Sequence, residues 1–154
     1  LVGRELDVER GDRVVEMAKR AAEASPREIA LADTIGVGVP AQVSEMVGRV
    51  REAVGDLPVR VHFHNTRGTG IANVWAAVNE GAATVDASLG GLGGCPFAPG
   101  AAGNVATEDV IYMLEQSGIR TGVMLAQVVE AAGWLAGVMG RPLPAMVSKA
   151  PAFP

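Results

Sequence analysis

The sequence predicts an α/β fold in which short strands and helices alternate along one chain. Three stretches with alternating apolar and polar residues are each followed by a segment whose apolar residues recur at helical spacing. Strands joined by such helices form a parallel sheet with right-handed connections. Periodicity alone leaves two architectures open, a doubly wound sheet and an eight-stranded barrel.

The predicted elements begin and end at residues typical of strand and helix boundaries. The strands are expected over Glu28–Asp33, Val59–His64 and Thr84–Leu89. The helices are expected from Asp12 to Ala24, from Pro40 to Gly55, from Ile71 to Gly81, through Val110 and Leu114 to Gly118, and from Leu125 to Gly140. Proline suits the first turn of a helix, and glycine suits the position where a helix stops.

Composition excludes several functional classes. The chain has 154 residues with a formal net charge of −4, and no basic cluster suggests binding to nucleic acid or to an anionic membrane. Its apolar runs are too short for a membrane span, and its one cysteine excludes an internal disulfide framework. We therefore expect a soluble, cytoplasmic protein.

His62 and His64 are the two histidines of the chain, and they lie two residues apart on a predicted strand. Their imidazoles therefore leave the same face, while Phe63 points toward the helices. Neutral imidazole nitrogens bind first-row divalent metals well, although one packed and one solvated histidine would explain the same spacing. Arg60 shares this face, so it must pair with an acid, reach solvent or lie near the far end of the strands.

Two further polar residues lie near predicted element ends. Asp33 ends its strand and could act as an acid, a base or a metal ligand, although a turn aspartate would look the same. Asn104 precedes a predicted helix and could be its N-cap. Because Thr107 is an equally good cap, Asn104 is free to offer its amide oxygen to a metal.

The loop from Gly90 to Asn104 contains the sequence Gly90-Gly91-Leu92-Gly93-Gly94-Cys95-Pro96. Its glycines permit positive φ and close approach of the backbone to a ligand, and proline restricts the path. Such a loop can move over a site or bring Cys95 to it. A lone cysteine is more often an inert buried side chain, but Cys95 lies in a loop and not in an apolar stripe, which favours a functional role.

Three ordered motifs together resemble the hydroxymethylglutaryl-CoA lyase family. They are Ala32-Asp33-Thr34-Ile35-Gly36-Val37-Gly38, His62-x-His64, and Gly90-Gly91-Leu92-Gly93-Gly94-Cys95-Pro96 followed by Gly103-Asn104-x-Ala106-Thr107-Glu108-Asp109. The likeness runs from about Asp12 to Gly140. The family is one of the metal-dependent (β/α)₈-barrel lyases and synthases. The resemblance therefore favours the C-terminal portion of such a TIM barrel, with about three βα units plus a C-terminal helix.

The resemblance also implies a reaction and a set of site residues. Family members cleave 3-hydroxy-3-methylglutaryl-CoA to acetyl-CoA and acetoacetate with Mg²⁺ or Mn²⁺, by retro-Claisen chemistry. His62, His64 and Asn104 would bind the metal, and Cys95, Asp33 and His64 would take part in catalysis. An acyl-CoA substrate is the partner that this resemblance implies.

Two departures from the family pattern leave the acyl group open. Asn65-Thr66-Arg67-Gly68 follows His64, where the best-known members carry an acid and then an aromatic residue. The family's strand-one arginine and the metal-binding aspartate beside it are not found in this sequence. The alternatives are a Claisen-type synthase, such as an isopropylmalate or homocitrate synthase, and a non-catalytic half-barrel. The Gly-Gly-Cys-Pro loop favours the lyase.

The chain opens with Leu1 and shows three of the eight barrel strands, so we expect residues 1–154 to form a partial barrel domain without its N-terminal half. In a closed barrel, Ile29 and Leu31 would be inward residues covered by the opposite wall. Without that wall, we expect the chain alone to self-associate, as a possible homo-oligomer, and to show no lyase activity.

Overall fold

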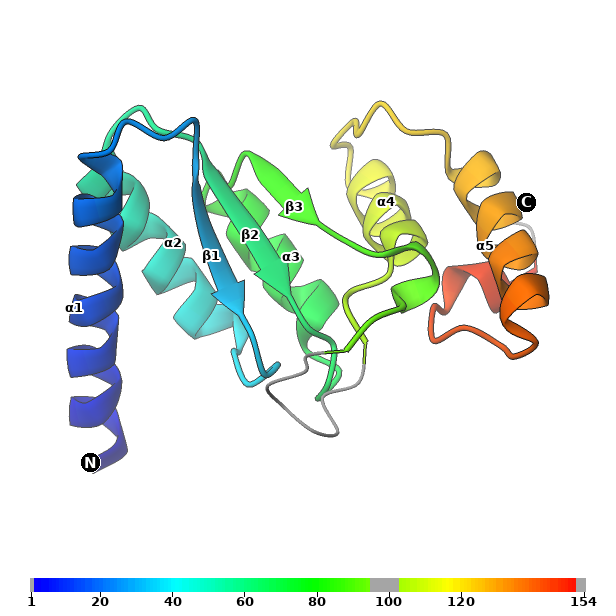
Figure 1. The fold of residues 1–154 in the computed structure, drawn as a ribbon, viewed down its shortest axis with the longest axis horizontal. Coiled ribbons are helices and arrows are strands. Elements are labelled where there is room, and N and C mark those ends of the chain that lie inside the picture. The colour runs from blue at the N-terminus through cyan, green and yellow to red at the C-terminus, as the bar shows by residue number, and fades with distance from the viewer. Residues whose placement is uncertain (1, 95–102, 152–154) are drawn as a thin grey trace.

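Three parallel strands form the centre of the structure, in the order β1-β2-β3 (Figure 1). They are β1 (Ile29–Asp33), β2 (Val59–Phe63) and β3 (Thr84–Asp86). The computed structural model describes residues 2–94 and 103–151. In the parallel register Ile29 lies beside Val59, and His62 lies beside Asp86. The predicted alternation of strands and helices around a parallel sheet is confirmed.

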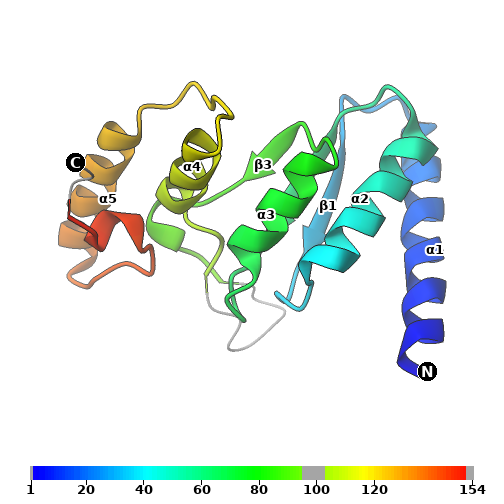
Figure 2. The same cartoon turned by 180° about the vertical axis from the view of Figure 1, so that it is seen from behind.

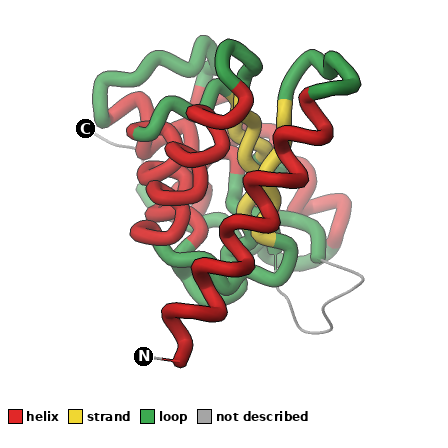
Figure 3. The backbone as a smooth tube through the Cα atoms, turned by 90° about the vertical axis from the view of Figure 1, so that its left-hand side faces the viewer, coloured by secondary structure: helices red, strands yellow, loops and turns green. Residues whose placement is uncertain are grey.

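The helices lie on one face of this sheet and beyond its two edges. Within the described residues they are α1 (Val2–Ala22), α2 (Pro40–Val54), α3 (Gly70–Asn79), α4 (Thr107–Gln116) and α5 (Leu125–Met139). Figure 2 shows α2 and α3 covering one face, with α4 and α5 beyond β3. Viewed from the side of α1, that helix lies in front of the strands (Figure 3). No helix in the described part of the chain is long and apolar enough to cross a bilayer.

The bounds of α2 agree with the sequence signals, but the start of α1 and the end of β3 differ from the prediction. α2 begins at Pro40 and stops at Gly55 as predicted, whereas α1 begins well before Asp12. β3 ends at Asp86 and not at Leu89, because the chain turns into a short 3₁₀ helix, η1 (Leu89–Gly91). Gly90 has a φ of 66° inside this turn, where a Cβ atom would be strained. The backbone therefore changes direction at Gly90, shortly after the strand has ended.

The hydrophobic core lies between the sheet and the helices that cover it. It contains Ile29, Val59, Val61 and Phe63 from the strands, and Val43, Val47, Val50 and Val74 from α2 and α3. Leu31 packs against the same cluster. The prediction that Ile29 and Leu31 face the barrel interior is therefore wrong. The reason is the register, which sets these two residues beside Val59 and Val61 on the helix-facing side.

The other face of the sheet carries small and polar side chains, and no helix of the described residues lies over it (Figure 1). By strand alternation and register, this open face consists of Ala30, Ala32, Arg60, His62, Thr84 and Asp86. Each of these residues is exposed or half-buried. The open face is thus a polar surface and not an uncovered half of the core.

Candidate metal and active site

The two histidines lie together at the carboxyl end of β2. His62 is in the strand, His64 follows it directly, and their ring centroids are 5.2 Å apart with an interplanar angle of 67°. This contact confirms that the two imidazoles leave the same side of the strand. It brings two nitrogen donors to the end of the sheet where active residues of α/β folds gather.

His64 is buried, with 5% of its surface exposed, and its Nδ1 atom has no hydrogen-bond partner among the described residues. Burial lowers the pKa of His64, and the neighbouring His62 lowers it further, while Asp33 acts in the opposite direction. The ring is therefore held in the neutral form, which is the form that donates to a metal. A buried polar atom without a partner normally indicates a bound group or an ordered water.

Asn104 reaches the same place from the far end of the glycine-rich loop. The backbone forms an isolated antiparallel bridge between His64 and Asn104, and Val105 N donates to Phe63 O at 3.2 Å. The side chain of Asn104 donates from Nδ2 to Leu92 O at 2.9 Å, which leaves Oδ1 as its remaining donor atom for an ion. Asn104 is not a helix cap, because α4 is preceded by Ala106 as its N-cap residue.

The donor set of His62, His64 and Asn104 fits a hard or borderline divalent cation only in part. Two imidazoles and one amide oxygen suit such an ion, but a carboxylate is the usual further ligand. Among the described residues, no group of three or more His, Cys, Asp or Glu side chains could hold a metal by itself. The three predicted ligands therefore form one side of a site that needs further ligands.

Asp33 lies close to His64 but has a structural task of its own. Its Oδ1 accepts a hydrogen bond from the amide of Val37 at 3.0 Å, and its Oδ2 accepts one from Gly38 at 2.9 Å. These two bonds hold the loop between β1 and α2, as expected of a turn aspartate. A catalytic role for Asp33 stays a prediction.

The residues that depart from the family pattern after His64 hold the neighbouring loops. Asn65 Oδ1 accepts a hydrogen bond from the amide of Gly70 at 3.0 Å, at the start of α3. Arg67 Nη1 donates to the carbonyls of Ile35 at 3.2 Å and Gly36 at 3.0 Å, and so ties the β1–α2 loop to the β2–α3 loop. The substituted residues thus have structural partners at the rim of the site.

Arg60 lies on the open face of the sheet and pairs there with two acids. Its Nη2 lies 2.7 Å from Glu28 Oε1, and its Nη1 contacts Asp86 Oδ1. Hydrogen bonds to Glu28 and then to Asp86 raise the pKa of Arg60. Asp86, which the sequence did not single out, lies beside His62 in the sheet register; its alternation with Thr84 in the third strand places it on the same face.

The turn at Gly90 is anchored from two later parts of the chain. The amide of Gly90 donates to Oε2 of the fully buried Glu108 at 3.0 Å, and its carbonyl accepts from the amide of Ala145 at 3.1 Å. A Cβ atom on Gly90 would lie 2.2 Å from Leu143 Cδ1, so only glycine fits under this segment. Asp109 holds the same segment by accepting from the amide of Val147 at 2.8 Å.

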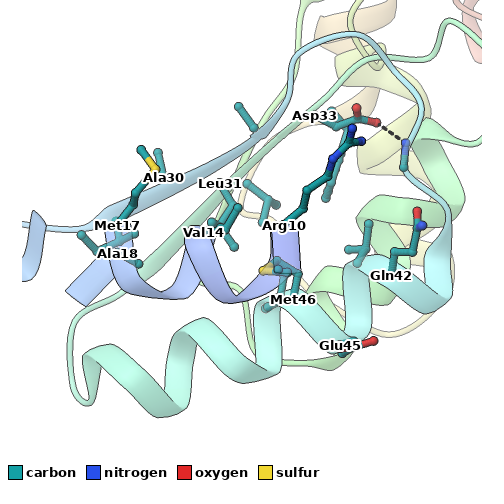
Figure 4. Close-up of a pocket in the computed structure, with 18 of the residues that line it drawn as sticks. Arg10, Val14, Met17, Ala18, Ala30, Leu31, Asp33, Gln42, Glu45 and Met46 are labelled. Atoms are coloured by element: carbon teal, nitrogen blue, oxygen red, sulfur yellow. Dashed lines mark hydrogen bonds between the residues drawn. The ribbon is translucent and has the colours of Figure 1, made fainter. Parts of the chain in front are cut away.

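A groove of about 1190 Å³ lies between α1, β1 and α2. Figure 4 shows Val14 of α1 beside Leu31 of β1 and Met17 and Ala18 of α1 near Ala30, with Asp33 at one end. The groove is mostly apolar, and the paired histidines are not among its lining residues. It runs along the edge of β1 that has no strand partner in the described part of the chain.

The candidate loop cysteine, Cys95, lies outside the described residues. The structure therefore brings together two of the predicted ligands, His62 and His64, places the backbone of Asn104 beside His64, and leaves Cys95 as a prediction.

Comparison with known proteins gives consistent matches. The model of the HMGL-like family matches residues 7–134. The (R)-citramalyl-CoA lyase of Chloroflexus aurantiacus is 45% identical over 144 residues, which are 93% of this chain and 45% of that protein. The hydroxymethylglutaryl-CoA lyase YngG of Bacillus subtilis is 44% identical over 133 residues, which are 86% of this chain and 44% of that protein.

A solved structure matches at the level of the fold. The HMG-CoA lyase of Acinetobacter baumannii, solved in complex with coenzyme A and 3-methylmalate, superposes with a TM-score of 0.84 and 42% sequence identity. The match covers 89% of this chain and 45% of that one. The chain thus spans less than half the length of the proteins it resembles.

Proposed function

The chain belongs to the HMGL-like family, and from that membership we propose that it is part of a lyase that cleaves a carbon–carbon bond in a CoA thioester. The predicted resemblance and the predicted barrel portion are both confirmed. The observation that supports the proposed chemistry best is the contact of His64 with His62 on one side and with Asn104 on the other. Both curated relatives described above are CoA-thioester lyases by name.

His62, His64 and Asn104 are the proposed ligands of Mg²⁺ or Mn²⁺. The orphaned, buried Nδ1 of His64 and the available Oδ1 of Asn104 support this assignment. When bound, such an ion would polarise the tertiary hydroxyl of the substrate and an adjacent oxygen. His64 contributes a neutral donor, because burial, and then the neighbouring His62, lower its pKa.

The reaction requires two proton transfers, one to and one from a group near this edge of the sheet. Removal of the hydroxyl proton breaks the neighbouring carbon–carbon bond and leaves a thioester enolate, which must then be protonated. Cys95, Asp33 and His64 are the proposed participants. Asp33 is held by two backbone amides, so its carboxylate can act only within the reach of the β1–α2 loop.

The proposed substrate is 3-hydroxy-3-methylglutaryl-CoA or a close 3-hydroxyacyl-CoA analogue. The named relatives act on hydroxymethylglutaryl-CoA or on citramalyl-CoA at similar identity, 44% and 45%, so identity does not separate the two substrates. A Claisen-type synthase of the same superfamily is the second candidate activity. A half-barrel without catalysis is the third, and the assay below distinguishes all three.

The catalytic unit is proposed to be the complete barrel. β1 has a free edge in the described part of the chain, and the apolar groove beside it is wide enough to hold further polypeptide. A parallel strand in this groove would cover Leu31 and the facing side of α1. We expect this chain alone to lack lyase activity and to self-associate through the groove, not through the polar open face.

Metal binding by the chain itself tests the ligand assignment. Mn²⁺ affinity is measured by electron paramagnetic resonance in the unmodified chain and in His62→Ala, His64→Ala and Asn104→Ala. Each substitution is expected to weaken binding at least about tenfold, which is the loss that even outer-shell changes produce. Asn79→Ala, at the exposed end of α3, is the matched control and is expected to leave the affinity unchanged.

Activity is tested in a chain extended by the N-terminal half of the family barrel. Acetyl-CoA release from hydroxymethylglutaryl-CoA and from citramalyl-CoA would identify the lyase and its acyl group. Condensation of acetyl-CoA with a 2-oxo acid would identify the synthase instead. No turnover in either direction by a folded, Mn²⁺-binding barrel would support the half-barrel without catalysis.

A further inference from the structure

We propose that Asp86 is a positioning residue for His62, which holds the ring proton on Nδ1 and so leaves Nε2 as the nitrogen that faces an ion. The use of Nε2 rests on the proposed function, because it assumes a metal at this place. The position of the ring proton does not, since it is a property of the metal-free chain and can be measured without any ion.

The sheet register places the two residues side by side. His62 and Asp86 are direct neighbours in the parallel pairing of β2 with β3, and both belong to the open face. His62 Nδ1 lies 3.9 Å from Asp86 Oδ2, and the two side chains are 32% and 38% exposed. On the other side of His62 the register places Ala32, which offers no polar side chain. Asp86 is therefore the acid on the strands that can select between the two ring nitrogens.

Arg60 holds one oxygen of the Asp86 carboxylate. Arg60 Nη1 contacts Asp86 Oδ1, while its Nε donates to Glu28 Oε1 at 2.8 Å. The arginine is thus anchored on both sides and holds one oxygen of Asp86. The other oxygen, Oδ2, is the one directed at His62. One acid would balance the charge of Arg60, and Glu28 already supplies it, so the approach of Asp86 Oδ2 to the imidazole is the feature that calls for a further explanation.

A neutral imidazole carries its proton on one nitrogen only, and a carboxylate stabilises the tautomer whose N–H faces it. Outer-shell carboxylates fix metal-binding histidines in this way in many proteins. The 3.9 Å separation is longer than a hydrogen bond, so in the metal-free chain the negative charge acts on the N–H dipole across a short gap. A small rotation of the ring would close the gap to a hydrogen bond.

Nitrogen-15 NMR of the whole 154-residue chain tests the position of the ring proton. Long-range proton–nitrogen spectra are recorded without metal at about pH 8.5, roughly two units above the ordinary imidazole pKa. We expect His62 to show a protonated Nδ1 and an unprotonated Nε2. In Asp86→Asn, which keeps the size of the side chain but removes its charge, we expect a shift of the population toward the Nε2–H tautomer.

Glu28→Gln is the matched control, because it removes the other acid partner of Arg60 without touching His62. Both variants lose one ion pair of the same arginine, so a merely structural role of Asp86 would give the same spectrum in both. A His62 that carries its proton on Nε2 in the unmodified chain would overturn the proposal. An unchanged tautomer in a folded Asp86→Asn chain would do the same, and Asp86→Ser replaces that variant if it does not fold.

Mn²⁺ affinity separates this inference from the proposed function. If both hold, Asp86→Asn weakens Mn²⁺ binding about 10- to 100-fold, while Glu28→Gln changes it less than about threefold. If the unmodified chain and the extended barrel bind no Mn²⁺, the metal proposal fails. The tautomer measurement then still decides whether Asp86 positions His62.

Discussion

The two faces of the three-stranded sheet have opposite characters. The helix-facing side carries Val59, Val61 and Phe63, which are at most 4% exposed and pack against α2 and α3. The open side carries Arg60, His62 and Asp86, which are about one-third exposed; Arg60 forms an ion pair with Asp86, and His62 Nδ1 lies 3.9 Å from Asp86 Oδ2. The first side is a core that stabilises the fold, and the second is a surface on which charged groups are held in fixed positions.

This difference indicates that the apolar core of the described residues is formed on the helix side of the sheet and not on the open face. Burial of apolar surface on the helix side provides the main favourable free energy of folding. The open face carries His62, a proposed metal ligand, and its half-buried ion pairs contribute little net stability. Stability and site chemistry are thus assigned to opposite sides of the same strands.

The largest expected difference in stability is between variants of two neighbouring residues of β2 whose side chains point to opposite faces of the sheet. Phe63→Ala removes a side chain from the core and is expected to lower the free energy of unfolding by about 3–5 kcal/mol. His62→Ala, one residue earlier, is expected to cost less than about 1 kcal/mol, because its ring is half-buried. Urea unfolding followed by circular dichroism measures both. Similar losses in the two variants would show that the open face is also part of the core.

A smaller effect is expected from two isosteric exchanges. Val61→Thr places a hydroxyl in a fully buried position on the helix side and is expected to cost about 1–3 kcal/mol. Thr84→Val, on the open side beside Arg60, is expected to change stability by less than about 0.5 kcal/mol. The same unfolding measurement applies. A stabilisation of more than about 1 kcal/mol in Thr84→Val would indicate that the open face is buried in solution, for example in a self-associated form.

The smallest effect concerns His64, which is buried although it follows the open-face alternation. Burial, and then the neighbouring His62, lower its pKa in the folded chain below the ordinary value of 6.5. As the pH falls below that value, the unfolded chain takes up a proton that the folded chain does not. The free energy of unfolding should therefore decrease on acidification, by at most about 1.4 kcal/mol per pH unit for one proton.

Unfolding of the metal-free chain between pH 8 and pH 5 measures this dependence, and His64→Gln is expected to flatten it. A stability that rises on acidification would mean that His64 gains a proton on folding. That result would contradict the neutral, buried ring on which the metal assignment depends.

Much of the fold could be predicted from local patterns. Helical spacing and the boundary residues Pro40 and Gly55 are local signals, and they located α2 closely. The orientation of β1 could not be predicted in the same way, because alternation separates two faces without saying which one is covered. The register that places Ile29 beside Val59 and Leu31 beside Val61 decides which face is covered, and that register is a property of the folded sheet.

The candidate site shows the same limit. The common face of His62 and His64 follows from strand geometry, and the structure confirms it. The approach of Asn104 to His64 joins residues 40 positions apart; placement near predicted element ends suggested it, and the family resemblance named the pair as ligands of one metal. Asp86 could not be recognised as a strand-end acid, because the predicted third strand continued to Leu89; in the structure Asp86 ends β3 and lies beside His62 in the register.

The double anchoring of Gly90 has a consequence for the order in which the protein matures on the ribosome. Its carbonyl is held by Ala145, which is about 55 residues further along the chain. At about 5–20 residues per second, that partner is synthesised roughly 3–11 s after the turn itself. The sheet and its covering helices can pack during this interval, whereas the turn at Gly90 cannot form its hydrogen bond with Ala145 until that residue has been synthesised. The nascent chain therefore acquires its core first and the finished rim of its site last.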